Sequence, residues 1–291
     1  MAKTALECAN RALQKLGCEV VTAIDGTTDT SKEAMFCYRN IDLVKKSLLR
    51  DYPWNFAMRR DRLLPPSRKL ISNIVYSAAN VAAIDIAAHG YSVGDFLTFE
   101  EITTPSELDG TWEVASVVDV DNITVTVPDL ASGIDNYTSP AYTRLSPAYE
   151  YSYLYTLPSD CLRVITINDE AVSDDWKIEG GKVLSDDESS ILIRYVKNVT
   201  DYDTMDDSFY ECLAAYLAWE GCDHLTGGAN KKRDLHTDLW GGDGKPGLLP
   251  KAKFIDVSED SLSRVQGDDW IGARFGGGGG FEPVTVETSA V

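Results

Sequence analysis

The spacing of apolar residues changes twice along the chain, and these changes limit the folds that it can adopt. Apolar residues recur at helical spacing up to Pro53, form short runs typical of strands from about Ser72 to Val196, and return to helical spacing after Asp206. Because a strand-rich segment separates two helical ones, the sequence predicts an α+β fold.

The helical segments carry start and stop signals. Thr4 and Glu7 fit a capping box, which predicts a first helix over residues 5–16. A second helix is expected to begin near Thr30, and it cannot continue through Pro53. Two further helices are predicted after the strand-rich segment: residues 207–226, capped by Asp206 or Asp207, and residues 231–240.

Residues 69–147 differ from the rest of the chain in charge and in pattern. They hold two basic residues, Lys69 and Arg144, against eleven acidic ones, a net charge of -9, whereas residues 1–60 have a net charge of +3. Their β-rich runs lie at residues 96–99, 112–118 and 123–127, with a hairpin turn expected at 119–122. We therefore expect a separate small antiparallel barrel or sandwich.

Alternation resumes after this segment and predicts a second sheet. The expected strands lie at residues 149–155, 162–167, 176–178 and 191–196. In the first of them, Tyr149, Tyr151, Tyr153 and Tyr155 alternate with other residues, so they are expected to point to one face. That face is either a core between sheets or a contact between subunits, and the pattern fits both.

Glycine and polar residues dominate from Gly241 onward, with five consecutive glycines at 276–280. Such a composition does not build a packed core, so it predicts an extended arm over residues 241–291. Trp270, Ile271, Arg274 and Phe275 are of the types that fill partner pockets, and they are the expected anchors of this arm.

The predicted organisation is an antiparallel helical bundle with a β-sheet region and an inserted small antiparallel β-barrel or sandwich domain. The predicted parts are residues 1–68, the first part of the helical body; 69–147, the inserted β domain; 148–240, the strands and helices of the body; and 241–291, the arm.

Charge and cysteine usage argue against several classes of function. Forty-six acidic residues against 27 basic ones give a net charge of -19, which repels the phosphates of nucleic acids and anionic lipids. The six cysteines show no paired spacing and are expected to be reduced and mostly buried. No signal peptide or membrane span is expected, which predicts synthesis and assembly in the cytosol.

The sequence shows no motif for catalysis or for a cofactor. Only three histidines are present, and there is no nucleophile elbow, metalloprotease motif or phosphate-binding loop. Cys222, His224 and His236 were the best zinc candidates, but a structural site needs four ligands with paired spacing. The acidic strings at 119–121 and 186–188 lack the rest of a calcium loop. We expect no enzyme, no metal and no cofactor.

Several segments resemble one family of phage proteins. These are residues 5–17, 25–28, 48–57, 155–163, 193–196 and the helix at 209–225. Together they resemble tail tubular protein A and related head-to-tail adaptors of short-tailed bacteriophages, and the most specific part is Pro53-Trp54-Asn55-Phe56-Ala57. The resemblance covers residues 1–62 and 147–240. Residues 89–114 are instead similar to small β-modules of phage tail and baseplate proteins.

The resemblance implies a structural protein of the virion, located in the tail or neck. It implies a dodecameric ring between the portal protein and the tail nozzle protein, with helices side by side around a channel through which DNA passes without specific binding. A tail fibre is a further partner to expect. Residues 258–291 would reach the portal, whereas Trp54 and Phe56 are expected to fill the core.

An alternative function belongs to a different class. The chain would then be a tail-associated binding module, whose inserted β domain recognises a host glycan or anchors a tail fibre. Tyr91, Trp112 and Tyr137 are the expected surface aromatics for such a site. A cell-wall hydrolase would need a pair of carboxylates that nothing in the sequence singles out.

Overall fold

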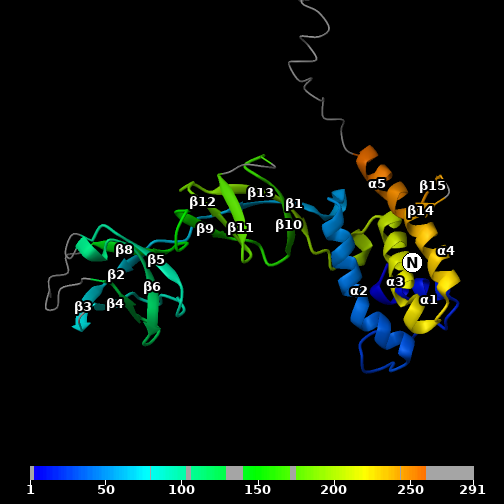
Figure 1. Cartoon of the computed structure of the whole chain (residues 1–291), viewed down its shortest axis with the longest axis horizontal. Helices are drawn as coiled ribbons and strands as arrows, with labels where there is room; N and C mark the ends of the chain where they lie inside the picture. Colours follow the sequence, from blue (N-terminus) through cyan, green and yellow to red (C-terminus); the bar gives the residue numbers. More distant parts are fainter. Residues whose placement is uncertain are drawn as a thin grey trace, which may run out of the picture.

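The chain has an α+β fold in which helices and antiparallel sheets occupy different regions (Figure 1). The computed structural model describes residues 3–78, 80–102, 106–128, 140–170, 175–242 and 244–259. Within them, a helical body, two three-stranded sheets and a barrel-like seven-stranded sheet follow one another along the long axis. None of the described helices is long and apolar enough to span a membrane.

Five α-helices make up the body in the described ranges, and one of them lies at its centre. They are α1 (Ala5–Leu16), α2 (Lys32–Asp51), α3 (Asp207–Leu225), α4 (Ala229–Trp240) and α5 (Leu248–Glu259). Helix α3 contacts each of the other four. Its buried residues therefore lie on several sides of the helix, as is typical of a helix enclosed by neighbours.

The caps explain where the helices begin. Thr4 Oγ1 accepts a hydrogen bond from the Glu7 backbone N–H at 3.1 Å, so α1 starts as its capping box predicts. Helix α2 starts at Lys32, and its cap lies one residue later than predicted, because Ser31 and not Thr30 accepts from the Ala34 N–H at 3.2 Å. Asp206 is the cap of α3.

The prediction of an extended arm from Gly241 is wrong for its first part. A two-stranded turn, β14 (Gly241–Gly242) and β15 (Lys245–Pro246), leads into α5. Leu249 and Ala252 of α5 are buried in the same core as α3, and α5 contacts both α3 and α4. This helix packs by contacts with residues far along the chain, which local composition does not reveal.

The inserted segment forms one antiparallel sheet that nearly closes on itself. Its strand order is β2-β8-β5-β6-β7-β4-β3. The strands are β2 (Lys69–Ile71), β3 (Asn73–Ala78), β4 (Val81–Asp85), β5 (Phe96–Glu100), β6 (Gly110–Val117), β7 (Asn122–Thr126) and β8 (Ala141–Leu145). The two edge strands, β2 and β3, are separated by Ser72 alone, whose N–H donates to the Asp85 carbonyl at 2.8 Å.

This barrel has a hydrophobic core of its own. Leu97, Phe99, Val114 and Ile123 are among its fully buried side chains, and the cluster contains no residue of the helical body. The predicted hairpin is confirmed, since β6 and β7 pair across residues 118–121. The described strands exceed those predicted, because β2, β3, β4 and β8 gave no clear alternation.

Two small sheets lie between the body and the barrel where one sheet was predicted. Strands β1 (Met58–Leu63), β13 (Ile191–Lys197) and β10 (Cys161–Ile167) form the first, in that order. Strands β11 (Trp176–Glu179), β12 (Lys182–Ser185) and β9 (Tyr153–Thr156) form the second. Side chains of both, among them Tyr155 and Tyr195, share one core, so the two sheets form a small sandwich.

The four alternating tyrosines do not share one environment. Tyr155 is fully buried, and its hydroxyl donates to the Ser189 carbonyl at 2.8 Å, whereas Tyr149 is 80% exposed. The strand starts only at Tyr153, because Glu150 has a φ of 73° and interrupts the extended backbone. The core interpretation holds for Tyr155 and for Tyr153, which packs against the same core, whereas Tyr149 and Tyr151 precede the strand and do not continue that face.

A buried arginine joins the barrel to the small sheets. Arg144 of β8 is 6% exposed, and its Nε donates to Glu100 Oε1 at 2.7 Å. Its Nη1 donates to the Ser152 carbonyl at 2.5 Å, and its guanidinium lies 3.9 Å from the ring centroid of Tyr153. Since Ser152 and Tyr153 belong to the segment after the barrel, this arginine ties the two parts together.

Candidate functional site

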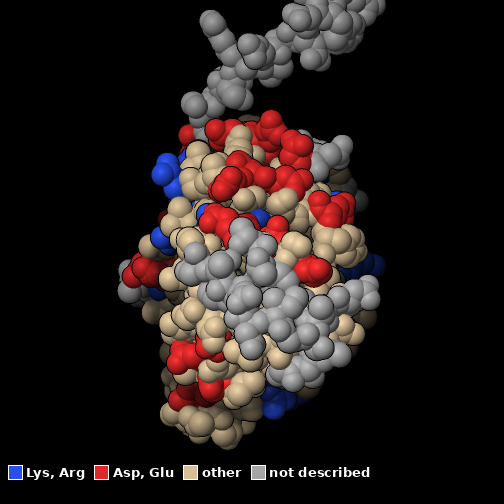
Figure 2. Space-filling model, turned by 90° about the vertical axis from the view of Figure 1, so that its left-hand side faces the viewer, with Lys and Arg blue, Asp and Glu red and all other residues tan. Residues whose placement is uncertain are grey.

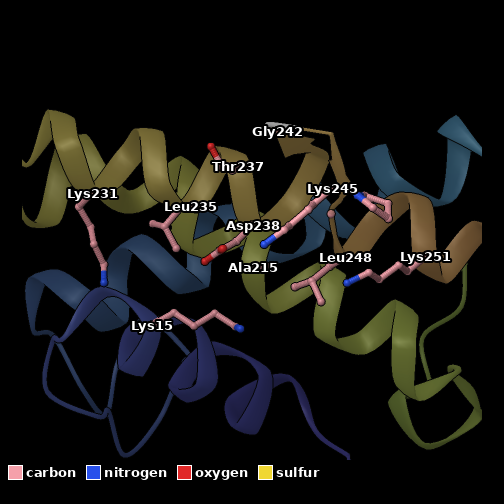
Figure 3. A pocket seen from close by; sticks show the side chains of 12 residues that line it. Lys15, Ala215, Lys231, Leu235, Thr237, Asp238, Gly242, Lys245, Leu248 and Lys251 are labelled. Carbon is pink, nitrogen blue, oxygen red and sulfur yellow. The ribbon is translucent and has the colours of Figure 1, made fainter.

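The helical body contains a lysine-lined cavity of about 590 Å³ (Figure 3). It lies between α1, α4 and α5, with Ala215 of α3 and the β14–β15 turn completing its wall. The side chains of Lys15, Lys245 and Lys251 point toward the same space, in which the Asp238 carboxylate also lies. The lining residues are Lys15, Ala215, Lys231, Leu235, Thr237, Asp238, Gly242, Lys245, Pro246, Gly247, Leu248 and Lys251.

The cavity is suited to binding an anion. Lys231, Lys245 and Lys251 form no ion pair with any residue that the structure describes, and Lys15 lies 3.9 Å from Glu211. Asp238 is the single acidic residue of the lining. The three lysines without described ion pairs and the one carboxylate of the lining leave a local positive charge in a chain with a net charge of -19.

Glycine is required in the turn that carries Lys245. Gly241 has a φ of 99°, and a Cβ at this position would lie 2.6 Å from the Lys245 carbonyl oxygen. A Cβ on Gly247 would lie 2.4 Å from the Leu239 carbonyl oxygen. The turn can therefore pack against the end of α4 only without these side chains, and this packing fixes Lys245 at the cavity.

The signature at residues 53–57 lies in the centre of the body and offers no exposed site. Trp54 is fully buried, and its Nε1 donates to the Leu48 carbonyl at 3.1 Å. The rings of Trp54 and Phe56 pack edge-to-face against Phe209 of α3, with centroid distances of 5.1 and 5.0 Å. The prediction that Trp54 and Phe56 fill the core is confirmed.

The signature also contacts α5 through hydrogen bonds between Asn55 and Asp256. Asp256 Oδ1 accepts from the Asn55 N–H at 2.9 Å, and Asn55 Nδ2 donates to the Asp256 carbonyl at 2.7 Å. Burial raises the pKa of the Asp256 carboxyl, and the hydrogen bond from Asn55 offsets only part of that rise. Asn55 therefore positions the second half of α5.

Two of the three predicted surface aromatics are not surface platforms. Tyr91 packs against the barrel core and stacks on His89 at 5.6 Å, and burial raises the pKa of its hydroxyl to about 12. Trp112 packs against the same core, and its Nε1 donates to the Leu108 carbonyl at 3.0 Å. Tyr137 lies outside the described residues. The alternative function, glycan recognition by exposed aromatic rings of the inserted domain, therefore has no support from Tyr91 or Trp112.

The cysteines and histidines that suggested zinc are not gathered into a site. Cys222 is fully buried in the body core, whereas His224 is exposed beside Phe36, at a ring distance of 6.0 Å. His236 packs on Trp240 instead, with ring centroids 4.6 Å apart. Across the described ranges, no group of three or more His, Cys, Asp or Glu side chains could hold a metal ion. Burial raises the pKa of the Cys8 thiol to about 12.

The predicted arm anchors, Trp270, Ile271, Arg274 and Phe275, lie outside the described residues. The last described helix nevertheless ends in exposed apolar side chains. Phe254 of α5 is 75% exposed, and Ile255 and Val257 beside it are also exposed. An apolar surface of this kind, next to residue 260, is typical of a contact with another protein.

One charged surface was missed by the sequence analysis. In β1 and β13, successive side chains point to opposite faces of the sheet. Leu63, Ile193 and Tyr195 point into the core between the two small sheets, and the other face carries Arg60 and Arg62 of β1 and Arg194 of β13. The three arginines therefore lie on the outer face, which we call the arginine face. The run Arg59-Arg60-Asp61-Arg62, directly after the signature, was the available signal, but only the pairing with β13 brings Arg194 beside it.

The chain matches no protein-family model, and no curated protein matches it.

Proposed function

We propose that the chain is a ring-forming head-to-tail adaptor of a short-tailed bacteriophage, similar to tail tubular protein A. It is a structural protein of the virion tail or neck without catalytic activity, cofactor or metal. Its ring stands between the portal protein and the tail nozzle protein, and DNA passes through the channel of that ring.

The observation that carries the proposal is the position of the signature residues. The segments that resemble the adaptors include α1, the end of α2 and α3, and they share one hydrophobic core with Trp54 and Phe56. A motif that resembles one family and fills the centre of the body supports a shared body architecture. We infer that the helices form an antiparallel bundle and stand side by side in the ring.

The apolar end of α5 supports a partner for the following segment. Phe254, Ile255 and Val257 would form the near part of the portal contact, and residues 260–291, with Trp270, Ile271, Arg274 and Phe275, would form the rest. The inserted β domain, residues 69–147, would lie at the outside of the ring, where a tail fibre is a further partner.

The test is the mass of the purified protein in solution, alone and mixed with the cognate portal ring, by light scattering. We expect a monomer alone and a complex containing twelve copies on the portal. A protein that stays monomeric and shows no affinity for the portal would overturn the proposal.

A chain that ends at Glu259 separates the arm from the body. Since α5 stays complete, this truncation should keep the helical content of the full chain while losing portal binding. The matched control is the full chain with Gly276–Gly280 changed to serines, which keeps the anchors and should bind the portal as the wild type does. A truncated chain that binds the portal normally would contradict the role of the arm.

A further inference from the structure

The arginine face is a cluster of positive charge without partners in the described structure. Arg60 lies directly opposite Arg194 in the pairing of β1 with β13, and Arg62 lies opposite the exposed Leu192. None of the three arginines forms an ion pair with a described residue, and the buried Nε of Arg194 has no hydrogen-bond partner there. Like charges directly opposite one another destabilise a sheet, so the isolated chain bears a cost at this face.

The face continues toward the helical body. Arg163 of β10 is exposed and lies opposite Val196, which is on the same side of the sheet as Arg194 but is buried in the core of the helical body. The Nη1 of Arg163 donates to the carbonyl of Arg50 at the end of α2 at 3.1 Å. Neither guanidinium forms an ion pair within the described ranges. The result is a basic strip on a chain whose net charge is -19, which is a surface for an acidic partner.

The barrel is an acidic part of the same chain that could meet this need. Residues 69–147 have a net charge of -9, and both of their basic side chains are already used within the fold. Lys69 Nζ donates to the Ala88 and His89 carbonyls at 2.7 and 2.6 Å, and Arg144 is buried. Viewed from the barrel end, acidic side chains gather in several groups, and basic side chains lie at scattered places between and around them (Figure 2).

We propose that the arginine face binds the acidic barrel of a second copy of this chain. The inference rests on the proposed function and deepens it, because it names the contact that joins neighbouring copies. A basic face repels its own image, so charge disfavours the two-fold contact of a symmetric dimer. A contact between two different surfaces is heterologous, and repetition of such a contact generates a ring when the rotation closes.

Phosphate is the competing partner, since arginine binds phosphate oxygens as readily as carboxylates. The overall charge of -19 argues against nucleic acid, because the acidic barrel of the same molecule would repel it. The barrel of a neighbouring copy is not repelled in this way by the arginine face, because the barrel is negatively charged and the face is positively charged.

A charge-swap experiment tests the contact. The face variant carries Arg60→Glu and Arg194→Glu, and the barrel variant carries Glu107→Lys, Asp109→Lys and Glu113→Lys, three exposed carboxylates without described ion pairs. Assembly of the full chain on the portal ring is followed by light scattering, and circular dichroism checks that each variant is folded. The variant with Arg60→Lys and Arg194→Lys is the matched control, which keeps the charge and should assemble.

We expect each swapped variant alone to need at least about tenfold more protein for half assembly, since like charges would then face each other across the contact. A one-to-one mixture should restore the ring, because copies that alternate have one swapped and one native contact. If wild type assembles but the mixture does not recover, the proposed contact is wrong and the adaptor function stands. The proposed contact would also be overturned if the wild type bound duplex DNA and the face variant did not. If wild type does not assemble at all, the proposed function and this inference fail together.

Discussion

Trp54 is the residue on which the packing of the helical body depends most. It is fully buried, contacts Phe209 of α3, and donates to the Leu48 carbonyl. We expect Trp54→Ala to lower the free energy of unfolding by about 3–5 kcal/mol, because the cavity cannot collapse between α2 and α3. Urea unfolding measures this, and Trp54→Phe, which keeps most of the ring volume, should lose less. A loss below about 1 kcal/mol for the alanine variant would contradict this view of the signature.

Asp256 makes the stability of the α5 contact depend on pH. Burial raises the pKa of its carboxyl in the folded chain above the value in the unfolded chain. The unfolded state therefore releases its proton first as pH rises, and the folded state loses stability from about pH 4 upward until its own pKa has been passed. Asp256→Asn removes this titration while keeping an oxygen for the Asn55 N–H. The urea midpoint of the variant, relative to that of the wild type, should rise as the pH is raised from about 4 to about 7. A difference between the two midpoints that does not change with pH would refute the assignment.

For single residues, the sequence predicted burial correctly only where the neighbouring residues gave a consistent secondary-structure pattern. Trp54 and Phe56 adjoin a predicted helix end, and both proved to be core residues. Tyr91 and Trp112 were expected at the surface because aromatic rings suit ligand contact, but ring type does not tell how deep a ring lies. The arginine face was missed since Arg60 and Arg194 are far apart in the chain and meet only through strand pairing.

Among the elements, α5 has the clearest effect to test. A chain ending at Gly247 loses Leu249, Ala252 and the Asp256 contact with Asn55, whereas a chain ending at Glu259 keeps them. We expect the shorter chain to lose at least about 2 kcal/mol of stability from the burial of these side chains, and the longer one to match the full protein. Thermal unfolding followed by circular dichroism compares the three. Equal stability of both truncated chains would mean that α5 contributes nothing to the body.

The joint formed by Arg144 is a second element to test. Arg144→Met removes the guanidinium from Glu100, Ser152 and Tyr153 and leaves the half-buried Glu100 without this partner. We expect a loss of about 2–3 kcal/mol, seen as faster hydrogen exchange in β5 and β8. Arg68→Met is the matched control: Arg68 pairs with the same Glu100 but is more exposed, so its loss should stay within about 1 kcal/mol. Similar exchange in both variants would argue against a buried joint.

Elements with local signals were predictable, and elements that depend on distant contacts were not. Helices α1 and α3 agree with their predicted bounds because each is directly preceded in the sequence by its capping residue, Thr4 or Asp206. Strand β6 and its hairpin partner β7 alternate clearly and were also found. Helix α5 follows a glycine-rich turn and packs against residues in α3 and α4, so its composition alone resembles an extended tail.

For the whole molecule, the separate cores predict separate unfolding. The barrel core contains no residue of the helical body, and the strands of the barrel pair only with one another. We expect residues 67–147, expressed alone, to give the circular dichroism of a β-sheet and one cooperative thermal transition. Calorimetry of the full chain should then show a transition at the same temperature. An isolated segment without cooperative unfolding would show that the barrel depends on Arg144 and the rest of its joint.

The pairing of β2 with β8 has a consequence for how this chain can evolve. Lys69, where the chain passes into the barrel, lies directly opposite Thr143, where it is about to leave. Because the two ends of the segment are neighbours, a gene that gains, loses or exchanges it keeps the flanking strands β1 and β9 in place. This geometry would let recombination replace the segment as one piece, and we expect sequence differences among relatives to concentrate within it.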